Sequence, residues 1–175
     1  IPMVCHNEMD KAYVDELARI IAYEGVPPLA DFGVLTSGTT GEPKPLWRRE
    51  ISWRDFFDIQ NDIFHINKDT KIFLQGSFSF TGVSNMVIAS LWAGGTVVTT
   101  SSLRPCRWMQ LIEEYNVDHI YALPTKLRLL VRHCKSKLSS IKYIIAGSQV
   151  LDRQLMEQLQ HICPDMEFIL YYGAS

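Results

Sequence analysis

Apolar positions recur at helical or strand spacing along most of the chain. Between Glu8 and Glu24, Tyr13, Leu17 and Ile21 share one face at helical spacing, and a Gly-Val-Pro-Pro sequence follows. This spacing predicts an amphipathic helix that the glycine and prolines end. The short apolar run at 33–37 predicts a strand, and 45–49 predicts a second extended segment that returns from the intervening loop.

Beyond residue 50, apolar runs alternate with amphipathic segments of about a dozen residues. Strands are predicted at 71–74, 96–99, 119–123, 141–146 and 167–171. Helices are predicted at 52–65, 81–93, 105–115, 124–133 and 152–162. Apolar strands that are each followed by a helix indicate a parallel sheet with both faces buried. The predicted fold class is therefore α/β, with a mostly parallel β-sheet and helices on both faces.

The helix at 52–65 has its own start signal and a predicted inward face. Ser52 followed by Asp55 resembles a capping box, in which two side chains bond the first backbone N–H groups of a helix. Phe56, Ile59 and Ile63 recur at helical spacing, so we expect them, together with neighbouring aromatics, to face the core.

One long run, from Ile72 through Leu103, contains no charged residue and is long enough to span a membrane. Gln75 and Asn85 interrupt it with polar groups, and Gly94-Gly95 divides it into a helical part and a β-branched part. We therefore expect a buried helix followed by a buried strand, and no membrane span.

Composition narrows the class of protein. The chain has 175 residues, 47% of them hydrophobic, and a formal net charge of −2, which fits one globular unit and disfavours a nucleic-acid partner. The four cysteines are far apart and form no zinc-binding pattern, so we expect free thiols in a reducing cytoplasm. The chain opens on Ile1 without a leader sequence, and we expect it to be a fragment of a cytoplasmic protein.

Glycine, hydroxyl and aromatic residues follow several predicted strands. Segments 36–44, 76–80, 147–149 and 172–175 each come directly after an apolar run. Parallel sheets bind ligands at the carboxyl ends of their strands, so these segments are the candidate site. Phe78 and Phe80 fit two interpretations, either core aromatics or walls of a pocket. Tyr171 and Tyr172 are adjacent, so in an extended strand their side chains face opposite sides, and we expect Tyr171 to point into the core.

Segment 36–44 combines four hydroxyls, two glycines and Lys44, which are groups that bind a polyphosphate. Glycine lets backbone N–H groups approach phosphate oxygens, hydroxyls donate further hydrogen bonds, and an ammonium offsets the charge. Pro43 and Pro45 flank Lys44, so the segment is not the P-loop of kinases and GTPases. On composition alone, a solvated hairpin loop is the alternative.

The complete string from Leu35 to Pro45 resembles the signature loop of the acyl-adenylate-forming superfamily. That superfamily includes acyl- and aryl-CoA synthetases, luciferases and the adenylation domains of peptide synthetases. The string departs from the usual ending because Pro45 stands where glycine is common. Residues 171–175, Tyr-Tyr-Gly-Ala-Ser, are similar to the Tyr-Gly-x-Thr-Glu motif of the same superfamily, with Ser175 at the threonine position.

The resemblance implies a role for the whole chain and for individual residues. Residues 1–175 would be the central subdomain of an enzyme that joins a carboxylic acid to Mg·ATP, releases pyrophosphate, and passes the acyl group to CoA or a carrier protein. The implied catalytic residues are Lys44 and Thr39. The implied nucleotide-binding residues are Thr36, Ser37, Gly38, Thr40, Gly41, Gly147, Ser148, Tyr172, Gly173 and Ser175. Phe80 and Gly147 would line the acyl pocket.

The same resemblance indicates what this stretch lacks. The Mg²⁺-binding glutamate is expected just after Ser175, and the catalytic lysine of the superfamily in a further domain. We therefore expect the isolated chain to be inactive, and its exposed apolar surfaces could drive self-association.

Three functions stay open at this point. An acyl-CoA synthetase acting in fatty acid metabolism is the first. The second is an aryl-acid ligase of a siderophore or peptide-synthetase pathway. The third, from a different class, is a non-catalytic nucleotide-binding or scaffold module that keeps the fold.

Overall fold

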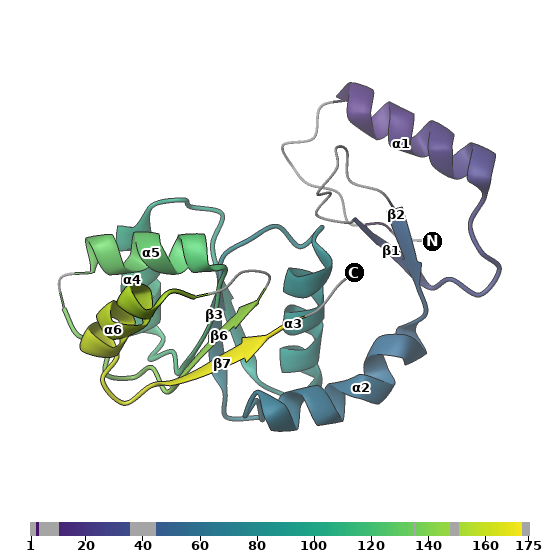
Figure 1. Ribbon diagram of the computed structural model, residues 1–175. Coiled ribbons are helices and arrows are strands. Elements are labelled where there is room, and N and C mark those ends of the chain that lie inside the picture. Colours follow the sequence, from purple (N-terminus) through teal and green to yellow (C-terminus); the bar gives the residue numbers. More distant parts are fainter. Residues whose placement is uncertain (1–2, 4–10, 36–44, 135, 148–150, 173–175) are drawn as a thin grey trace.

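A five-stranded parallel sheet forms the centre of the molecule (Figure 1). The computed structural model describes residues 3, 11–35, 45–134, 136–147 and 151–172. The strands are β1 (Phe32–Leu35), β2 (Pro45–Arg48), β3 (Lys71–Leu74), β4 (Thr96–Thr99), β5 (His119–Tyr121), β6 (Tyr143–Gly147) and β7 (Glu167–Tyr171). The helices are α1 (Lys11–Glu24), α2 (Glu50–Ile63), α3 (Thr81–Trp92), α4 (Pro105–Glu114), α5 (Pro124–His133) and α6 (Arg153–Ile162).

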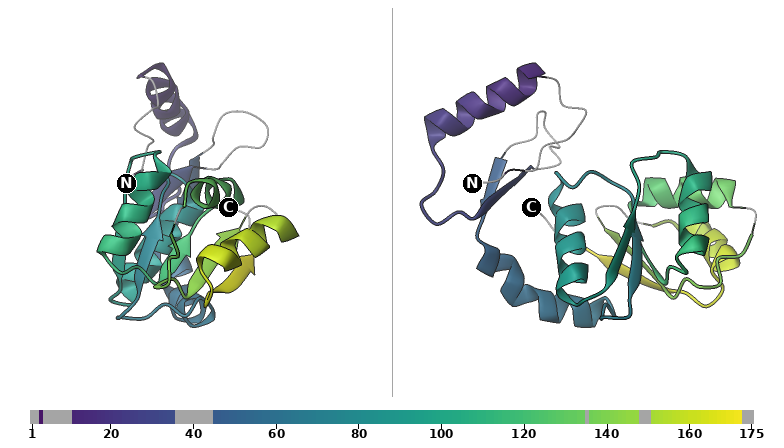
Figure 2. Two further views of the ribbon diagram at one scale, coloured as in Figure 1. Left: turned by 90° about the vertical axis from the view of Figure 1, so that its left-hand side faces the viewer. Right: turned by 180° about the vertical axis from the view of Figure 1, so that it is seen from behind.

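The sheet has the strand order β4-β3-β5-β6-β7, and every neighbouring pair is parallel. α3 lies on one face, whereas α4, α5 and α6 lie on the other (Figures 1 and 2). The predicted α/β class, the parallel sheet and the helices on both faces are therefore confirmed. The sheet strands lie close to their predicted positions.

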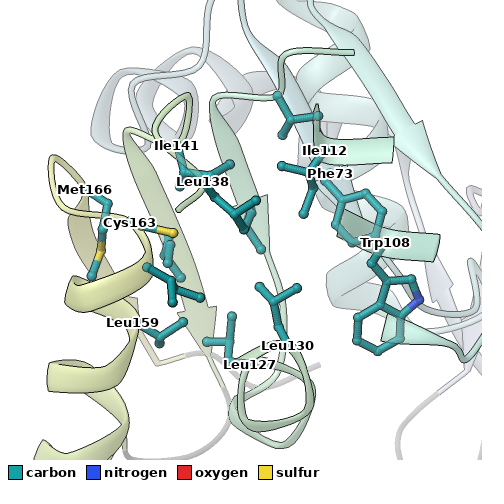
Figure 3. Close-up of a cluster of buried hydrophobic side chains, with 14 of the residues drawn as sticks. Phe73, Trp108, Ile112, Leu127, Leu130, Leu138, Ile141, Leu159, Cys163 and Met166 are labelled. Carbon is teal, nitrogen blue, oxygen red and sulfur yellow. The ribbon is translucent and has the colours of Figure 1, made fainter. Parts of the chain in front are cut away.

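Alternate residues of the central strands enter two different cores. Phe73, Ile120 and Ile144 point to the side of α4, α5 and α6, where they join a large cluster with Trp108, Leu127 and Leu159 (Figure 3). Their neighbours Ile72, Tyr121 and Ile145 point to the side of α3 and pack with Phe64 and Met86. Because successive side chains of a strand face opposite sides, strands covered on both faces are apolar throughout, which is the pattern the sequence showed.

β1 and β2 form a separate antiparallel pair beside the parallel sheet. Val34 of β1 packs with Trp53 and Phe57 of α2 and with Ala89 of α3. The return segment predicted after the loop is confirmed as β2. The strand predicted at 33–37 is confirmed as β1, but it is not a member of the parallel sheet.

α2 corrects two predictions. Phe56, Ile59 and Ile63 are at least half exposed, whereas the buried face carries Trp53 and Phe57. This helix bears apolar side chains on more than one face, and helical spacing alone does not show which of these faces meets the core.

The start of α2 is also different from the prediction. The helix begins at Glu50, and the Ser52 hydroxyl donates to the Arg49 carbonyl. The backbone N–H of Glu50 donates to the Asp31 carboxylate at 2.8 Å, so a residue far back in the chain supplies the acceptor that the capping-box interpretation assigned locally.

The long uncharged run forms the predicted helix, turn and strand, as α3 and β4, but neither element is buried throughout. Leu91 and Trp92 of α3 are exposed, and β4 is an edge strand in which only Val98 is buried. Gly94 has a φ of 81°, a left-handed conformation that glycine adopts without strain. Within the described part of the chain, no helix is long and apolar enough to cross a membrane.

The described cysteines are free thiols: Cys106 is exposed, Cys134 half-buried and Cys163 buried. Cys5 lies outside the described residues. No group of three or more His, Cys, Asp or Glu side chains that could hold a metal ion occurs among the residues the structure describes.

Candidate functional site

The carboxyl ends of β3, β5, β6 and β7 form one edge of the sheet, here called the carboxyl rim. The arrowhead of β7 points toward α3 in both Figure 1 and the right-hand view of Figure 2. Crevices at this edge are where open parallel sheets bind ligands. Most segments that the sequence singled out follow strands that end here.

The described residues that flank segment 36–44 are attached to this rim. Leu35 and Pro45, the residues on either side of the segment, are partners in the β1–β2 pair. The Leu35 backbone N–H donates to the Ser79 carbonyl at 3.1 Å, and Leu35 forms a parallel bridge with Phe80. Although β1 lies outside the parallel sheet, the phosphate-binding candidate therefore begins next to the loop that follows β3.

That loop, residues 75–80, is held by its own serines. The hydroxyl oxygens of Ser77 and Ser79 lie 2.8 Å apart, and the Ser84 hydroxyl of α3 donates to the Phe78 carbonyl. Phe78 and Phe80 are 40% and 36% exposed, which argues against the interpretation of both as core aromatics. Phe80 is the N-cap residue of α3, so its ring stands at the rim, where the sequence placed a pocket wall.

Two tyrosines lie beneath this rim: Tyr171, which begins the motif at 171–175, and Tyr121, which sequence reasoning did not single out. The hydroxyl oxygens of Tyr121 at the end of β5 and Tyr171 at the end of β7 are 2.8 Å apart. Burial raises the pKa of both phenols, so they are neutral hydroxyls. The inward direction predicted for Tyr171 is confirmed, because it packs with the apolar cluster on the α3 side. Each tyrosine is the last residue of its strand; the sequence pattern marked this position for Tyr171 but placed Tyr121 in the middle of the strand predicted at 119–123.

Lys126 is a second group that sequence reasoning missed. Its ammonium donates to the Gln75 carbonyl, and burial lowers its pKa. It stands in the first turn of α5, directly after β5, so its place at the rim follows from the alternation of strands and helices. The Oε1 atom of Gln75 is also buried, and it has no hydrogen-bond partner among the residues that the structure describes.

The other predicted site residues divide into two sets. Gly147 ends β6 at the rim, and Tyr172 is 94% exposed just beyond β7, next to the inward-pointing Tyr171. An exposed ring at this edge is available to stack on a flat ligand. Residues Thr36, Ser37, Gly38, Thr39, Thr40, Gly41, Lys44, Ser148, Gly173 and Ser175 lie outside the described residues. Their roles stay predictions.

Residues 32–175 match the family model described as AMP-binding enzyme. The chain belongs to this family. It is 30% identical over 174 residues to the putative long chain fatty acid-CoA ligase VraA of Staphylococcus epidermidis, covering 97% of this chain and 35% of that protein. The predicted membership of the adenylate-forming superfamily is therefore confirmed.

Solved structures share the fold of this AMP-binding chain. The N-terminal domain of FACL13 from Mycobacterium tuberculosis superposes with a TM-score of 0.72 at 20% identity, over 91% of this chain and 42% of that one. O-succinylbenzoate Coenzyme A Synthetase from Bacillus subtilis, in complex with ATP and magnesium ion, gives a TM-score of 0.71 at 20% identity, over 82% and 30%. The chain spans about a third of the length of the curated relatives it matches.

Proposed function

We propose that the complete protein carrying this chain is an ATP-dependent acid–thiol ligase of the acyl-CoA synthetase type, acting in the cytoplasm. Residues 1–175 would be its central subdomain, which carries the phosphate-binding segment. The AMP-binding family match and a relative named as a putative fatty acid-CoA ligase support the reaction class.

The observation that carries the proposal is the anchoring of segment 36–44 at the carboxyl rim. Leu35 and Pro45 pair at its two ends, and the Leu35 N–H is bonded to the Ser79 carbonyl in the loop that precedes Phe80. The candidate phosphate-binding segment is thereby attached to the edge at which Gly147 and Tyr172 stand, so one edge of the sheet would offer groups for phosphates, a flat base and an acyl group.

The proposed chemistry has two steps. An oxygen of the carboxylate attacks the α-phosphorus of ATP, and the bond from that phosphorus to the bridging oxygen breaks, so that acyl-AMP forms and pyrophosphate leaves. A thiol of CoA or of a carrier protein then attacks the acyl carbonyl and AMP leaves. The protein contributes mainly by aligning the reactants and by stabilising phosphate charge.

Each part of the site has a distinct task in this proposal. Thr36, Ser37, Gly38, Thr39, Thr40, Gly41 and Lys44 hold the β- and γ-phosphates. Gly147, Ser148, Tyr172 and Gly173 frame the adenine, and the Ser175 hydroxyl reaches the α-phosphate. Phe80 and Gly147 border the acyl group.

Magnesium would accompany the ATP phosphates, as a magnesium ion accompanies ATP in the complex of O-succinylbenzoate Coenzyme A Synthetase. The described residues contain no cluster of His, Cys, Asp or Glu that could hold a metal ion. From the resemblance to the superfamily, the proposal assigns the Mg²⁺ carboxylate ligand to a position following Ser175.

The test is carboxylate-dependent exchange of pyrophosphate into ATP by the complete protein, with fatty, aryl and amino acids assayed in parallel. Exchange with one class of acid would support the proposal and name the substrate class. ATP binding without exchange for any acid would contradict it and favour a non-catalytic nucleotide-binding module.

A further inference from the structure

The hydroxyl pair of Tyr121 and Tyr171 crosses the face of the sheet that carries α3. Tyr121 ends β5 and Tyr171 ends β7, and β6 lies between these two strands. The two rings lie at 24° to one another with centroids 6.4 Å apart, and their hydroxyl oxygens meet at 2.8 Å. The pair therefore forms a bridge over the carboxyl end of β6.

Two glycines mark how tightly this bridge fits. A Cβ added to Gly147 at the end of β6 would lie 2.6 Å from Cζ of Tyr171. A Cβ added to Gly82 in the first turn of α3 would lie 2.6 Å from the Tyr121 hydroxyl oxygen and 3.6 Å from that of Tyr171. Neither glycine has room for a methyl group on the side that faces the tyrosines, so the pair fills the space between α3 and β6.

This filled space lies next to the proposed acyl walls. Phe80 immediately precedes α3 and stands two residues before Gly82, while Gly147 is itself the second wall. An acyl chain that entered between Phe80 and Gly147 and extended toward the core would meet the two tyrosines.

The bridge is a fixed element of the core. Tyr121 is 8% exposed, and the ring of Tyr171 lies 5.5 Å from that of Phe64. Displacing either ring would separate the bonded hydroxyls and leave one of them unpaired in a largely buried place, which is costly. The tyrosines therefore act as a floor, and an acyl chain cannot displace them cheaply.

We propose that Tyr121 and Tyr171 close the acyl pocket beneath Phe80 and Gly147 and restrict the enzyme to short carboxylic acids. This inference rests on the proposed function and specifies its substrate class. The predicted preference for short acids differs from the long-chain fatty acid in the name of the Staphylococcus epidermidis relative.

The test measures kcat/KM of the complete protein for a series of straight-chain acids from acetate to dodecanoate. The natural protein should prefer the shortest acids. Tyr171→Ala opens the floor and should raise kcat/KM for octanoate relative to acetate by at least about 10-fold, because each methylene accommodated in the opened space contributes a factor of roughly 10 or more. Tyr171→Leu, which leaves a smaller cavity, should give an intermediate shift. Tyr23→Ala, at a 93% exposed tyrosine of α1, is the matched control and should leave the profile unchanged.

The outcomes separate the two proposals. A natural protein that uses dodecanoate as well as acetate would overturn the short-acid inference while leaving the ligase function intact. If both Tyr171 variants fold, as checked by circular dichroism, and keep the natural preference among acids of different length, the short-acid inference is likewise overturned. No exchange with any acid would overturn the proposed function, and this inference with it.

Discussion

A Cβ placed on Gly82 would lie 2.6 Å from the hydroxyl oxygen of Tyr121, closer than a Cβ atom approaches a non-bonded oxygen. Replacing a helical glycine by alanine ordinarily stabilises a helix by about 1 kcal/mol. Here overpacking, which costs about 1–3 kcal/mol, should outweigh that gain. We therefore expect Gly82→Ala to lower the free energy of unfolding, measured by urea titration.

A double-mutant cycle identifies the cause. Tyr121→Phe removes the oxygen that Gly82→Ala would strike, and should itself cost about 1 kcal/mol for the lost hydrogen bond to Tyr171. In the Tyr121→Phe background, Gly82→Ala should be much less destabilising. Simple additivity of the two changes would contradict the contact as described.

Lys44→Ala tests the phosphate-binding segment. A hydrogen bond to a charged group contributes roughly 1.5–3 kcal/mol, so loss of the ammonium should slow exchange at limiting ATP by about 10- to 100-fold. The assay is pyrophosphate exchange by the complete protein. Lys137→Ala, at an exposed lysine, is the control for loss of one positive charge. Equal rates for Lys44→Ala and the natural protein at limiting ATP would remove Lys44 from the site.

The parallel sheet was predictable because its strands are apolar throughout and each is followed by a helix. The rim was predictable for the same reason, since alternation of strand and helix places every strand end at one edge. The separation of β1 and β2 from the parallel sheet could not be predicted, because a short apolar run such as Phe32–Leu35 does not indicate which strand it will pair with.

The errors have physical causes at particular residues. Helical spacing gave Phe56, Ile59 and Ile63 the inward face of α2, but tertiary packing buried Trp53 and Phe57 instead. The Tyr121–Tyr171 pair was beyond sequence reasoning, since the contact joins residues fifty positions apart through a register that only the folded sheet defines. The family resemblance made Gly147 a candidate site residue, and the structure adds that its missing side chain makes room for Tyr171.

The three described cysteines should differ in reactivity. Burial raises the pKa of the Cys163 thiol to about 12, with the nearby Cys134 adding to the shift, and burial also raises the pKa of Cys134. Since the thiolate is the reactive form, iodoacetamide at neutral pH should modify the exposed Cys106 in the folded protein and spare Cys163.

Mass spectrometry of alkylated peptides checks this order. Cys163 should become reactive only when urea unfolds the protein. In the folded Cys106→Ser variant, the peptide that contains position 106 should take up no label. Rapid labelling of Cys163 in the native protein would show that its thiol is accessible and that the α6 end of the core is open.

Stability at acid pH should depend on Asp152, the N-cap residue of α6. Its carboxylate accepts the Leu155 backbone N–H at 2.8 Å and also contacts Arg128, and these two interactions lower its pKa. A carboxyl whose folded pKa lies below its unfolded value, about 3.9, contributes stability above that value. This contribution is lost as the pH falls through the folded pKa, because the group must then be protonated in both states.

Asp152→Asn keeps an acceptor for the Leu155 N–H but removes the charge, so it isolates this pH-dependent part. The natural protein should have the higher urea midpoint near neutral pH, and the difference should shrink steadily as the pH is lowered below about 4. Asp165→Asn, at an exposed carboxylate outside the helices, controls for the loss of one negative charge. If the midpoints of the natural protein and the Asp152→Asn variant differed by a constant amount down to strongly acid pH, the cap would act through its shape alone, without its charge.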